Sequence, residues 1–444
     1  MQLPQATEAV ASVKPVEATP GEPLRVFLDS ANMYCRPNGI LSSRIYTYLQ
    51  RNGHCLVPEP RDAQYVICNT CGFDGNFRGI SLSLFSEYEK LLAPGARLVS
   101  VGCLNAMYAE LAATHPQLIR ISHLGELDAL FFRRIKFLDI QEAYLRQTDI
   151  AHLYANRKAV GWSERVLLGM MGRMRGLLEG AVSRGVPEAV RYREVMDEFS
   201  FESKAFVEIG SGCASNCSYC VIKKAKGPVV SRTVEAILKD IEAAREPGKS
   251  LCLVADDCGS YGLDLGESLP GLLRAIGEHF PGLPLDILYL NPHWLEKQWE
   301  TYNAVLAETT IRSINIPIQT GSSRILSLMN RNYDVNRVSE IVRTFKSTSP
   351  RTLFITHVMV GFPSETSEDF RQTRRALDGF DMFWHFRYTN HEGTPAAALP
   401  DPVPEWLRRL RSVRLSLGRL AQHAGYATRA LLASARNRAA GPEL

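Results

Sequence analysis

Three cysteines stand close together near the middle of the 444-residue chain, Cys213, Cys217 and Cys220. They follow an apolar stretch of strand length, Ala205–Ile209, with the spacing Cys-x3-Cys-x2-Cys. Three thiolates on one short loop can hold three irons of a 4Fe–4S cube and leave the fourth iron open. The spacing therefore predicts an iron–sulfur cluster that takes part in a reaction, with these cysteines as its ligands.

Three other kinds of site use cysteines at comparable spacing. A structural zinc site usually has four ligands, often in two Cys-x2-Cys pairs, and no second pair lies nearby in this sequence. Disulfides need an oxidising compartment, which the ten cysteines of this long chain do not indicate, because residues 1–23 lack the features of a secretory signal. A ferredoxin-type carrier would bring a fourth cysteine close, whereas the next one is Cys252, inside an apolar stretch.

Six apolar stretches of strand length follow one another from residue 204 onward, with helical patterns between them. The segment 234–241 has the spacing of a helix with one buried face, and Thr366, three residues before Asp369, indicates a helix start. Strands that alternate with helices predict a parallel sheet with crossover helices. The expected strands are Ala205–Ile209, Leu251–Ala255, Leu285–Leu290, Ser313–Ile318, Leu353–Val360 and Met382–Tyr388.

Polar and glycine-containing segments follow the other five expected strands, as the cysteine loop follows the first. In a barrel of strand–helix units, the reacting groups lie at the C-terminal ends of the strands. Carboxylates, amides and closely approaching backbone at these ends could surround a small ligand. Each segment alone reads more often as a turn or a helix cap. The segments are 256–262, 291–292, 319–322, 361–366 and 392–395.

A second set of three cysteines lies upstream, in a different layout. Cys35, Cys71 and Cys103 each come shortly after an expected strand, and helical stretches near 40–52 and 81–93 connect these strands. If the strands are parallel, their C-terminal ends bring three thiols to one edge of a small α/β domain. The expected strands are Leu24–Leu28, Gln64–Ile67 and Arg97–Val101. Free cysteine is also a common small buried side chain, and this explanation applies to Cys55, Cys68, Cys252 and Cys258.

Composition limits the classes of protein that remain. A chain with 45% hydrophobic and 22% charged residues can form two or three domains with sizeable cores. Its apolar runs are too short to cross a membrane, and a formal net charge of +4 permits an anionic partner without indicating one. We expect residues 1–23 to be a disordered tail and the protein to work in the reducing cytoplasm.

The cysteine loop, with Tyr219 between its second and third ligands, resembles the cluster loop of the radical S-adenosylmethionine (SAM) superfamily. Both cysteine sets together resemble the methylthiotransferases, the radical SAM group that includes the MiaB-type tRNA enzymes and the RimO-type enzyme acting on a ribosomal protein. Segments 257–262 and 291–292 most resemble the type that modifies threonylcarbamoyladenosine in tRNA. The matching segments, within roughly 24–125 and 200–405, are 35–38, 69–71, 102–103, Asp264, 316–322, 329–333, 361–366 and 392–397.

The resemblance implies two 4Fe–4S clusters and SAM. The cluster on Cys213, Cys217 and Cys220 would bind and cleave SAM, and the resulting 5′-deoxyadenosyl radical would remove hydrogen from an inert carbon. That carbon would take sulfur from an auxiliary cluster and a methyl group from a second SAM, so both clusters must open onto one cavity. An electron donor such as a flavodoxin or ferredoxin is implied as well. The auxiliary ligands would be Cys35, Cys71 and Cys103, and the expected SAM neighbours, by position, are Tyr219, Asp257, Ser260, Gln319 and Ser322.

The sequence departs from the family pattern in three places. Leu41-Ser42-Ser43 replaces a usual Asp-Ser-Glu, and residues 126–200 form a long segment with helical character at 167–178 and 186–199. The stretch 404–440 is helical in pattern, where family members normally carry a β-barrel TRAM domain. Its arginines could bind phosphates or line a solvated helix face. They are Arg408, Arg409, Arg411, Arg414, Arg419, Arg429, Arg436 and Arg438.

We therefore expect an α/β protein with a small parallel-sheet domain, a radical SAM partial (βα)6 barrel and a C-terminal helical extension. The expected parts are 1–23, 24–125, 126–200, 201–400 and 401–444. The expected function is a methylthiotransferase with a tRNA adenosine derivative as acceptor. Two alternatives remain open: a radical SAM enzyme that modifies a peptide or small natural product, and a non-enzymatic iron–sulfur sensor or nucleic-acid binder.

Overall fold

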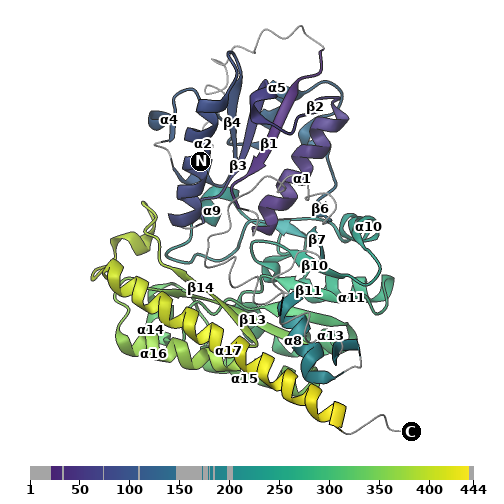
Figure 1. Cartoon of the computed structure of the whole chain (residues 1–444), viewed down its shortest axis with the longest axis vertical. Coiled ribbons are helices and arrows are strands. Elements are labelled where there is room, and N and C mark those ends of the chain that lie inside the picture. The colour runs from purple at the N-terminus through teal and green to yellow at the C-terminus, as the bar shows by residue number, and fades with distance from the viewer. Residues whose placement is uncertain are drawn as a thin grey trace. The chain divides into compact units, whose positions relative to one another are not determined.

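The computed structural model describes residues 22–32, 35–73, 75–108, 111–146, 173, 179, 181–183, 186–197 and 204–439. The chain divides into two compact units (Figure 1). The first comprises Met1–Ala155 with Val221–Gly227, and the second Asn156–Cys220 with Pro228–Leu444. Nearly all of the expected tail and most of the expected helix at 167–178 lie outside the described residues, and the expected five-part division stays a prediction.

The first unit contains a sheet of five parallel strands in the order β2-β1-β3-β4-β5 (Figure 1). The three strands expected from the sequence are confirmed, with β1, β3 and β4 each reaching a residue or more further than expected. Helices α1 and α2 connect them. The strands are β1 (Arg25–Ser30), β2 (Cys55–Leu56), β3 (Tyr65–Thr70), β4 (Arg97–Gly102) and β5 (Ile119–Arg120). The helices are α1 (Arg36–Arg51), α2 (Gly75–Leu91), α3 (Leu104–Met107), α4 (Leu111–Thr114), α5 (Asp128–Phe131) and α9 (Ile222–Lys226), with the short strand β6 at Tyr144–Leu145.

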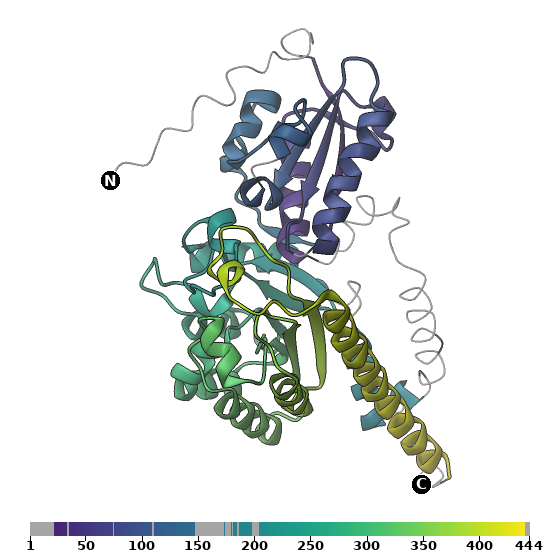
Figure 2. The ribbon, with the colours of Figure 1, turned by 90° about the vertical axis from the view of Figure 1, so that its left-hand side faces the viewer.

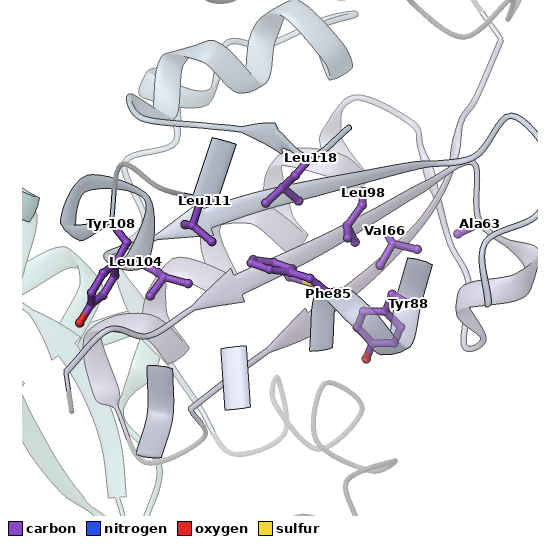
Figure 3. Close-up of a cluster of buried hydrophobic side chains, with 10 residues drawn as sticks. Ala63, Val66, Phe85, Tyr88, Leu98, Leu104, Tyr108, Leu111 and Leu118 are labelled. Carbon is purple, nitrogen blue, oxygen red and sulfur yellow. The ribbon is translucent and has the colours of Figure 1, made fainter. Parts of the chain in front are cut away.

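Apolar side chains pack on one face of this sheet (Figure 3). Phe85 of α2 is fully buried against Val66 of β3 and Leu98 of β4. Leu104 and Tyr108 extend the same cluster at the end of β4, next to Cys103. Burial of such side chains contributes about 25 cal/mol per Å2 of apolar surface, so the sheet edge that carries the upstream cysteines stands on a packed core.

The second unit contains six parallel strands in the order β14-β13-β12-β11-β10-β7 (Figure 1). All six strands expected from the sequence are confirmed in their order along the chain. Each strand pairs with the next one in sequence, as in a barrel of strand–helix units. The strands are β7 (Lys204–Glu208), β10 (Ser250–Val254), β11 (Leu285–Leu288), β12 (Ile311–Asn315), β13 (Leu353–Val360) and β14 (Met382–Arg387), with the short pair β8 (Gly210–Ser211) and β9 (Val230–Ser231).

Helices follow the strands of this unit, and several of them begin at polar caps. Thr366 and Asp369 form the predicted capping box at the start of α16, each side chain accepting from the other residue's backbone N–H. Ser268, Asn291 and Ser322 cap α11, α12 and α14 through their side chains. The helices are α10 (Val234–Ala244), α11 (Leu269–His279), α12 (Pro292–Lys297), α13 (Trp299–Glu308), α14 (Ser323–Leu328), α15 (Val335–Thr348) and α16 (Ser367–Ala376).

The expected C-terminal helical extension is confirmed as one long helix, α17 (Glu405–Ala439), which runs along β14 (Figure 2). It also packs on α8 (Pro187–Asp197) through Ala427 and Ala430. Within the described residues, none of the helices is long and apolar enough to span a membrane.

Several arginines of α17 are used inside the second unit. The guanidinium of Arg411 is buried and pairs with the buried carboxylate of Glu365 at 2.5 Å. Arg408 donates to the Tyr388 carbonyl at 3.0 Å and lies against Gly361. Arg419 lies over the Trp384 ring. These side chains anchor the helix and therefore contribute little to a phosphate-binding surface.

Candidate iron–sulfur centres

The three upstream thiols meet at the C-terminal edge of the first sheet. Cys35 precedes α1 in the connection from β1, Cys71 directly follows β3, and Cys103 directly follows β4. Cys71 is 1% exposed, whereas Cys35 and Cys103 are half-buried. Parallel neighbouring strands end at the same edge, and so three loops from separate parts of the sequence converge here.

The electrostatics of Cys71 confirm that these thiols lie close to one another. A hydrogen bond with Cys103, burial, and the charges of Cys103 and Cys35 together raise the pKa of Cys71 well above its usual value. The Asn32 side-chain amide donates to the Cys71 sulfur at 3.3 Å, and this hydrogen bond lowers the pKa of Cys71. The structure thus brings Cys35, Cys71 and Cys103 together, and their role as cluster ligands stays a prediction.

Gly102 allows the loops after β3 and β4 to approach. Its φ is +95°, and a Cβ atom there would lie 2.4 Å from the Thr70 carbonyl oxygen and 2.7 Å from Asn69 Oδ1. The Gly72 N–H donates to the Cys103 sulfur at 3.2 Å. A side chain at position 102 would therefore separate the two thiols that these loops carry.

A network of buried amides supports this edge of the sheet. Asn69 donates to the Asn38 carbonyl at 2.7 Å and to the Ser42 hydroxyl at 2.9 Å, and Asn38 donates to the Thr70 carbonyl at 3.1 Å. Ser42 belongs to the segment that departs from the family pattern, and it serves here as a hydrogen-bond acceptor. Sequence reasoning did not identify these supporting residues, although Asn38 and Asn69 stand within three residues of Cys35 and Cys71.

The three barrel cysteines lie on one loop after β8 and are all half-buried. Backbone and side-chain hydrogen bonds hold the middle of this loop on the connection after α14. Ser218 donates its N–H to the Met329 carbonyl at 2.9 Å and its hydroxyl to the Leu328 carbonyl at 2.7 Å. Asn330 donates to the Asn216 carbonyl at 2.7 Å. The sequence places these thiols together, and distant residues fix the shape of their loop.

Charged groups flank this loop on two sides. Burial and the nearby carboxylate of Asp257 raise the pKa of Cys213 to about 11. Arg331 lies beside Cys217, with Nη1 3.5 Å from the sulfur and 3.4 Å from the Tyr219 hydroxyl. The guanidinium therefore places N–H donors and a positive charge next to this ligand position. Sequence reasoning missed Arg331, although the matching segment 329–333 contained it.

Asp257 and Ser260 support the cysteine loop from the end of β10. Asp257 Oδ2 accepts from the Ser260 hydroxyl at 2.6 Å and from Trp294 Nε1 at 2.8 Å, and Oδ1 accepts from the Gly259 and Asn291 N–H groups. The Ser260 oxygen accepts in turn from the Ala214 N–H at 3.3 Å. Both carboxylate oxygens of Asp257 therefore already have donors, which makes this residue a support for the loop.

The side chains of the other three expected SAM neighbours differ in the number of hydrogen bonds that they already make within the protein. The Ser322 hydroxyl donates to Asp369 at 2.5 Å and caps α14, whereas Tyr219 accepts from Arg331 and lies edge-on to Phe362. Gln319 has φ +59°, and its backbone bonds to β13 on both sides. Its side-chain amide has no hydrogen-bond partner in the described part of the chain, so it is the one of the five with full capacity to bind a ligand.

Neither triad surrounds a single metal ion: among the described residues, no group of three or more His, Cys, Asp or Glu side chains could hold one. A 4Fe–4S cube instead offers each thiolate its own iron. Each site supplies three thiols with N–H donors directed at sulfur, from Asn32 and Gly72 in one and from Ser215 and Arg331 in the other. Both donor sets therefore suit a cluster with three protein ligands.

Comparison with known proteins finds matches to both parts of the chain. Residues 207–377 match the family model described as the radical SAM superfamily, and residues 30–121 match the one described as uncharacterized protein family UPF0004. The ribosomal protein uS12 methylthiotransferase RimO of Roseiflexus sp. (strain RS-1) is 29% identical over 84% of this chain and 76% of its own. The same enzyme of Thermotoga sp. (strain RQ2) is 29% identical over 83% of this chain and 77% of its own.

A tRNA-modifying relative matches a shorter part of the chain. The probable threonylcarbamoyladenosine tRNA methylthiotransferase of Archaeoglobus fulgidus is 36% identical over 48% of this chain and 51% of its own. Two matched domains in the expected order, together with these relatives, imply the cofactors SAM and 4Fe–4S clusters. The chain therefore belongs to the radical SAM methylthiotransferases of the MiaB/RimO-like type.

Proposed function

We propose that this methylthiotransferase uses Cys213, Cys217 and Cys220 for the cluster that cleaves SAM, and Cys35, Cys71 and Cys103 for an auxiliary cluster. The observation that carries the proposal is the presence of two thiol triads, each at the C-terminal edge of its own parallel sheet. When bound, SAM and the clusters supply the radical and the sulfur that an inert C–H bond requires, because no base can remove its hydrogen as a proton.

The chain's own residues hold and orient these groups. Asp257 accepts from four donors and so holds Ser260, whose hydroxyl oxygen accepts from the Ala214 N–H of the cysteine loop. Gln319, in the segment after β12, has a side-chain amide without a partner in the described structure that could bind a polar group of SAM, and the Tyr219 hydroxyl accepts from Arg331. Glycine at position 102 keeps the auxiliary thiols together.

We propose a polypeptide side chain as the acceptor. The relatives that match most of the chain are named as methylthiotransferases of a ribosomal protein. The arginine-rich helix α17 would be the natural candidate for phosphate contacts. Three of its arginines, Arg408, Arg411 and Arg419, instead contact residues of their own unit. A tRNA acceptor is the second candidate, favoured by the relative that is 36% identical over 48% of the chain.

One experiment compares the two acceptors directly. Anaerobically reconstituted enzyme, reduced by a flavodoxin or ferredoxin, is incubated with SAM and either a uS12 peptide or tRNA that carries threonylcarbamoyladenosine without a methylthio group. We expect one methylthio group to replace one hydrogen on the peptide, detected by mass spectrometry, and no gain on nucleosides of the digested tRNA. Gain on the nucleosides alone would reverse the assignment, and SAM cleavage without sulfur transfer to either would favour an acceptor of another kind.

The proposal also requires both clusters in one chain and a reducing compartment such as the cytoplasm. Wild-type protein should contain about eight iron atoms, and a Cys35→Ala/Cys71→Ala/Cys103→Ala variant about four. That the two clusters open onto one cavity stays a prediction. Measuring the magnetic coupling between the reduced clusters by electron paramagnetic resonance (EPR) would test it, since absent coupling contradicts a shared cavity.

A further inference from the structure

We propose that Arg331 is a positioning residue that donates to the Cys217 thiolate and raises the reduction potential of the barrel cluster. This inference rests on the proposed function, because it takes Cys213, Cys217 and Cys220 as the ligands of that cluster. It does not depend on which acceptor the enzyme modifies.

The guanidinium is held in place by hydrogen bonds in several directions. Nη2 donates to Asn291 Oδ1 and to the Pro317 carbonyl, both at 3.0 Å, and Nε lies 3.4 Å from the Tyr333 hydroxyl. These contacts leave Nη1 directed at the Cys217 sulfur and the Tyr219 hydroxyl. The orientation of the donor toward sulfur is therefore set by residues from three separate segments of the barrel.

The charge of Arg331 is not balanced by the protein. The residue is 8% exposed, and none of the described carboxylates forms a salt bridge with it; its acceptors are a thiol, two phenols, an amide and a backbone carbonyl. A buried charge without an opposite charge is strongly unfavourable. A cluster bound through thiolates would bring negative charge to this position, which gives the buried cation its partner.

A cation in this position changes the electron affinity of the cluster. The reduction potential of an iron–sulfur cluster depends on its net charge and on hydrogen bonds to its sulfurs. Both effects of Arg331 stabilise the reduced form, which carries one more negative charge. The planar fork of arginine serves sulfur and phenol at once, whereas lysine keeps the charge but not this geometry.

The test measures how much of the cluster is reduced at a fixed potential. In the full chain with Cys35→Ala, Cys71→Ala and Cys103→Ala, so that only the barrel cluster is observed, EPR follows reduction at poised potentials. We expect Arg331→Met to lower the ratio of reduced to oxidised cluster at least tenfold, equivalent to about 59 mV for one electron. Arg331→Lys should lower it less.

Arg343→Met is the matched control. Arg343 is exposed on α15, and its guanidinium bonds only to the Ser339 carbonyl in the described structure, so this variant should keep the wild-type ratio. Unchanged ratios in Arg331→Met and Arg331→Lys would overturn the inference. If Arg331→Met does not retain a cluster, Arg331→Lys alone tests the inference: a lowered ratio of reduced to oxidised cluster supports it, and an unchanged ratio overturns it. A shifted ratio in this background, together with a wild-type protein that transfers no methylthio group, would contradict the proposed function and leave this inference standing.

Discussion

The two thiol triads are assembled in different ways. The barrel triad lies on eight consecutive residues, 213–220. Two charged side chains from elsewhere in the chain, Asp257 and Arg331, lie next to it. The upstream triad comes from three loops separated by more than thirty residues each, and its neighbours are neutral amides such as Asn32 and Asn69. The barrel site thus has its ligands set by local sequence and its electrostatics by the fold, whereas the upstream site depends on the fold for the ligands themselves.

Substituting one cysteine of each triad should separate the two sites most strongly. Cys217→Ala removes a ligand of the cluster that cleaves SAM, so we expect no SAM cleavage and no sulfur transfer. Cys71→Ala should abolish sulfur transfer and leave part of the SAM cleavage, because the barrel cluster stays intact. Chromatographic measurement of 5′-deoxyadenosine gives the SAM cleavage of both variants, and mass spectrometry of the acceptor gives their sulfur transfer. Equal loss of cleavage in the two variants would mean that the triads do not work independently.

The dependence of the upstream site on the fold can be tested at Gly102. Gly102→Ala places a Cβ atom against the Thr70 carbonyl at a backbone φ of +95°, so the loops of β3 and β4 must move apart. We expect iron to fall from about eight to about four atoms per chain, with SAM cleavage retained.

Gly95→Ala is the matched control for Gly102→Ala. Its φ is +82° but no atom lies within 4 Å of the added Cβ, so it carries the backbone strain without the clash. We expect its iron content to stay near that of the wild type. Equal iron loss in both variants would assign the effect to strain and not to the approach of the loops.

Asp257→Asn tests the support of the barrel loop. The amide keeps one acceptor oxygen where the carboxylate offers two, so two of its four donors lose their partner; a buried unsatisfied group costs about 1–3 kcal/mol. We expect the barrel cluster to be lost more readily than the auxiliary one when iron is removed by a chelator. Asp334→Asn, at the exposed start of α15, is the control, since asparagine caps a helix as well as aspartate does. Equal rates of loss of the two clusters in Asp257→Asn would contradict this role.

The sequence predicted the parts of both sites that depend on local pattern. Apolar stretches ending in cysteine placed Cys71 and Cys103 correctly at strand ends, and the loop spacing grouped Cys213 with Cys217. The supporting contacts join residues far apart in sequence, such as Arg331 with Cys217 or Asp257 with Trp294. Such pairs depend on how helices and strands pack, and neither periodicity nor spacing contains that information. The engagement of Asp257 and Ser322 by their own neighbours was invisible for the same reason.

The smallest expected effect concerns Ser42, in the segment that departs from the family pattern. Its hydroxyl accepts from the buried Asn69 amide, so Ser42→Ala removes one acceptor and should lower the free energy of unfolding by about 1 kcal/mol. Ser43→Ala, whose side chain makes no hydrogen bond within the described structure, should change it little. Chemical denaturation of the two variants measures the difference. If Ser42→Ala also halves the iron content at this small cost in stability, the upstream site depends on its amide network as closely as on its thiols.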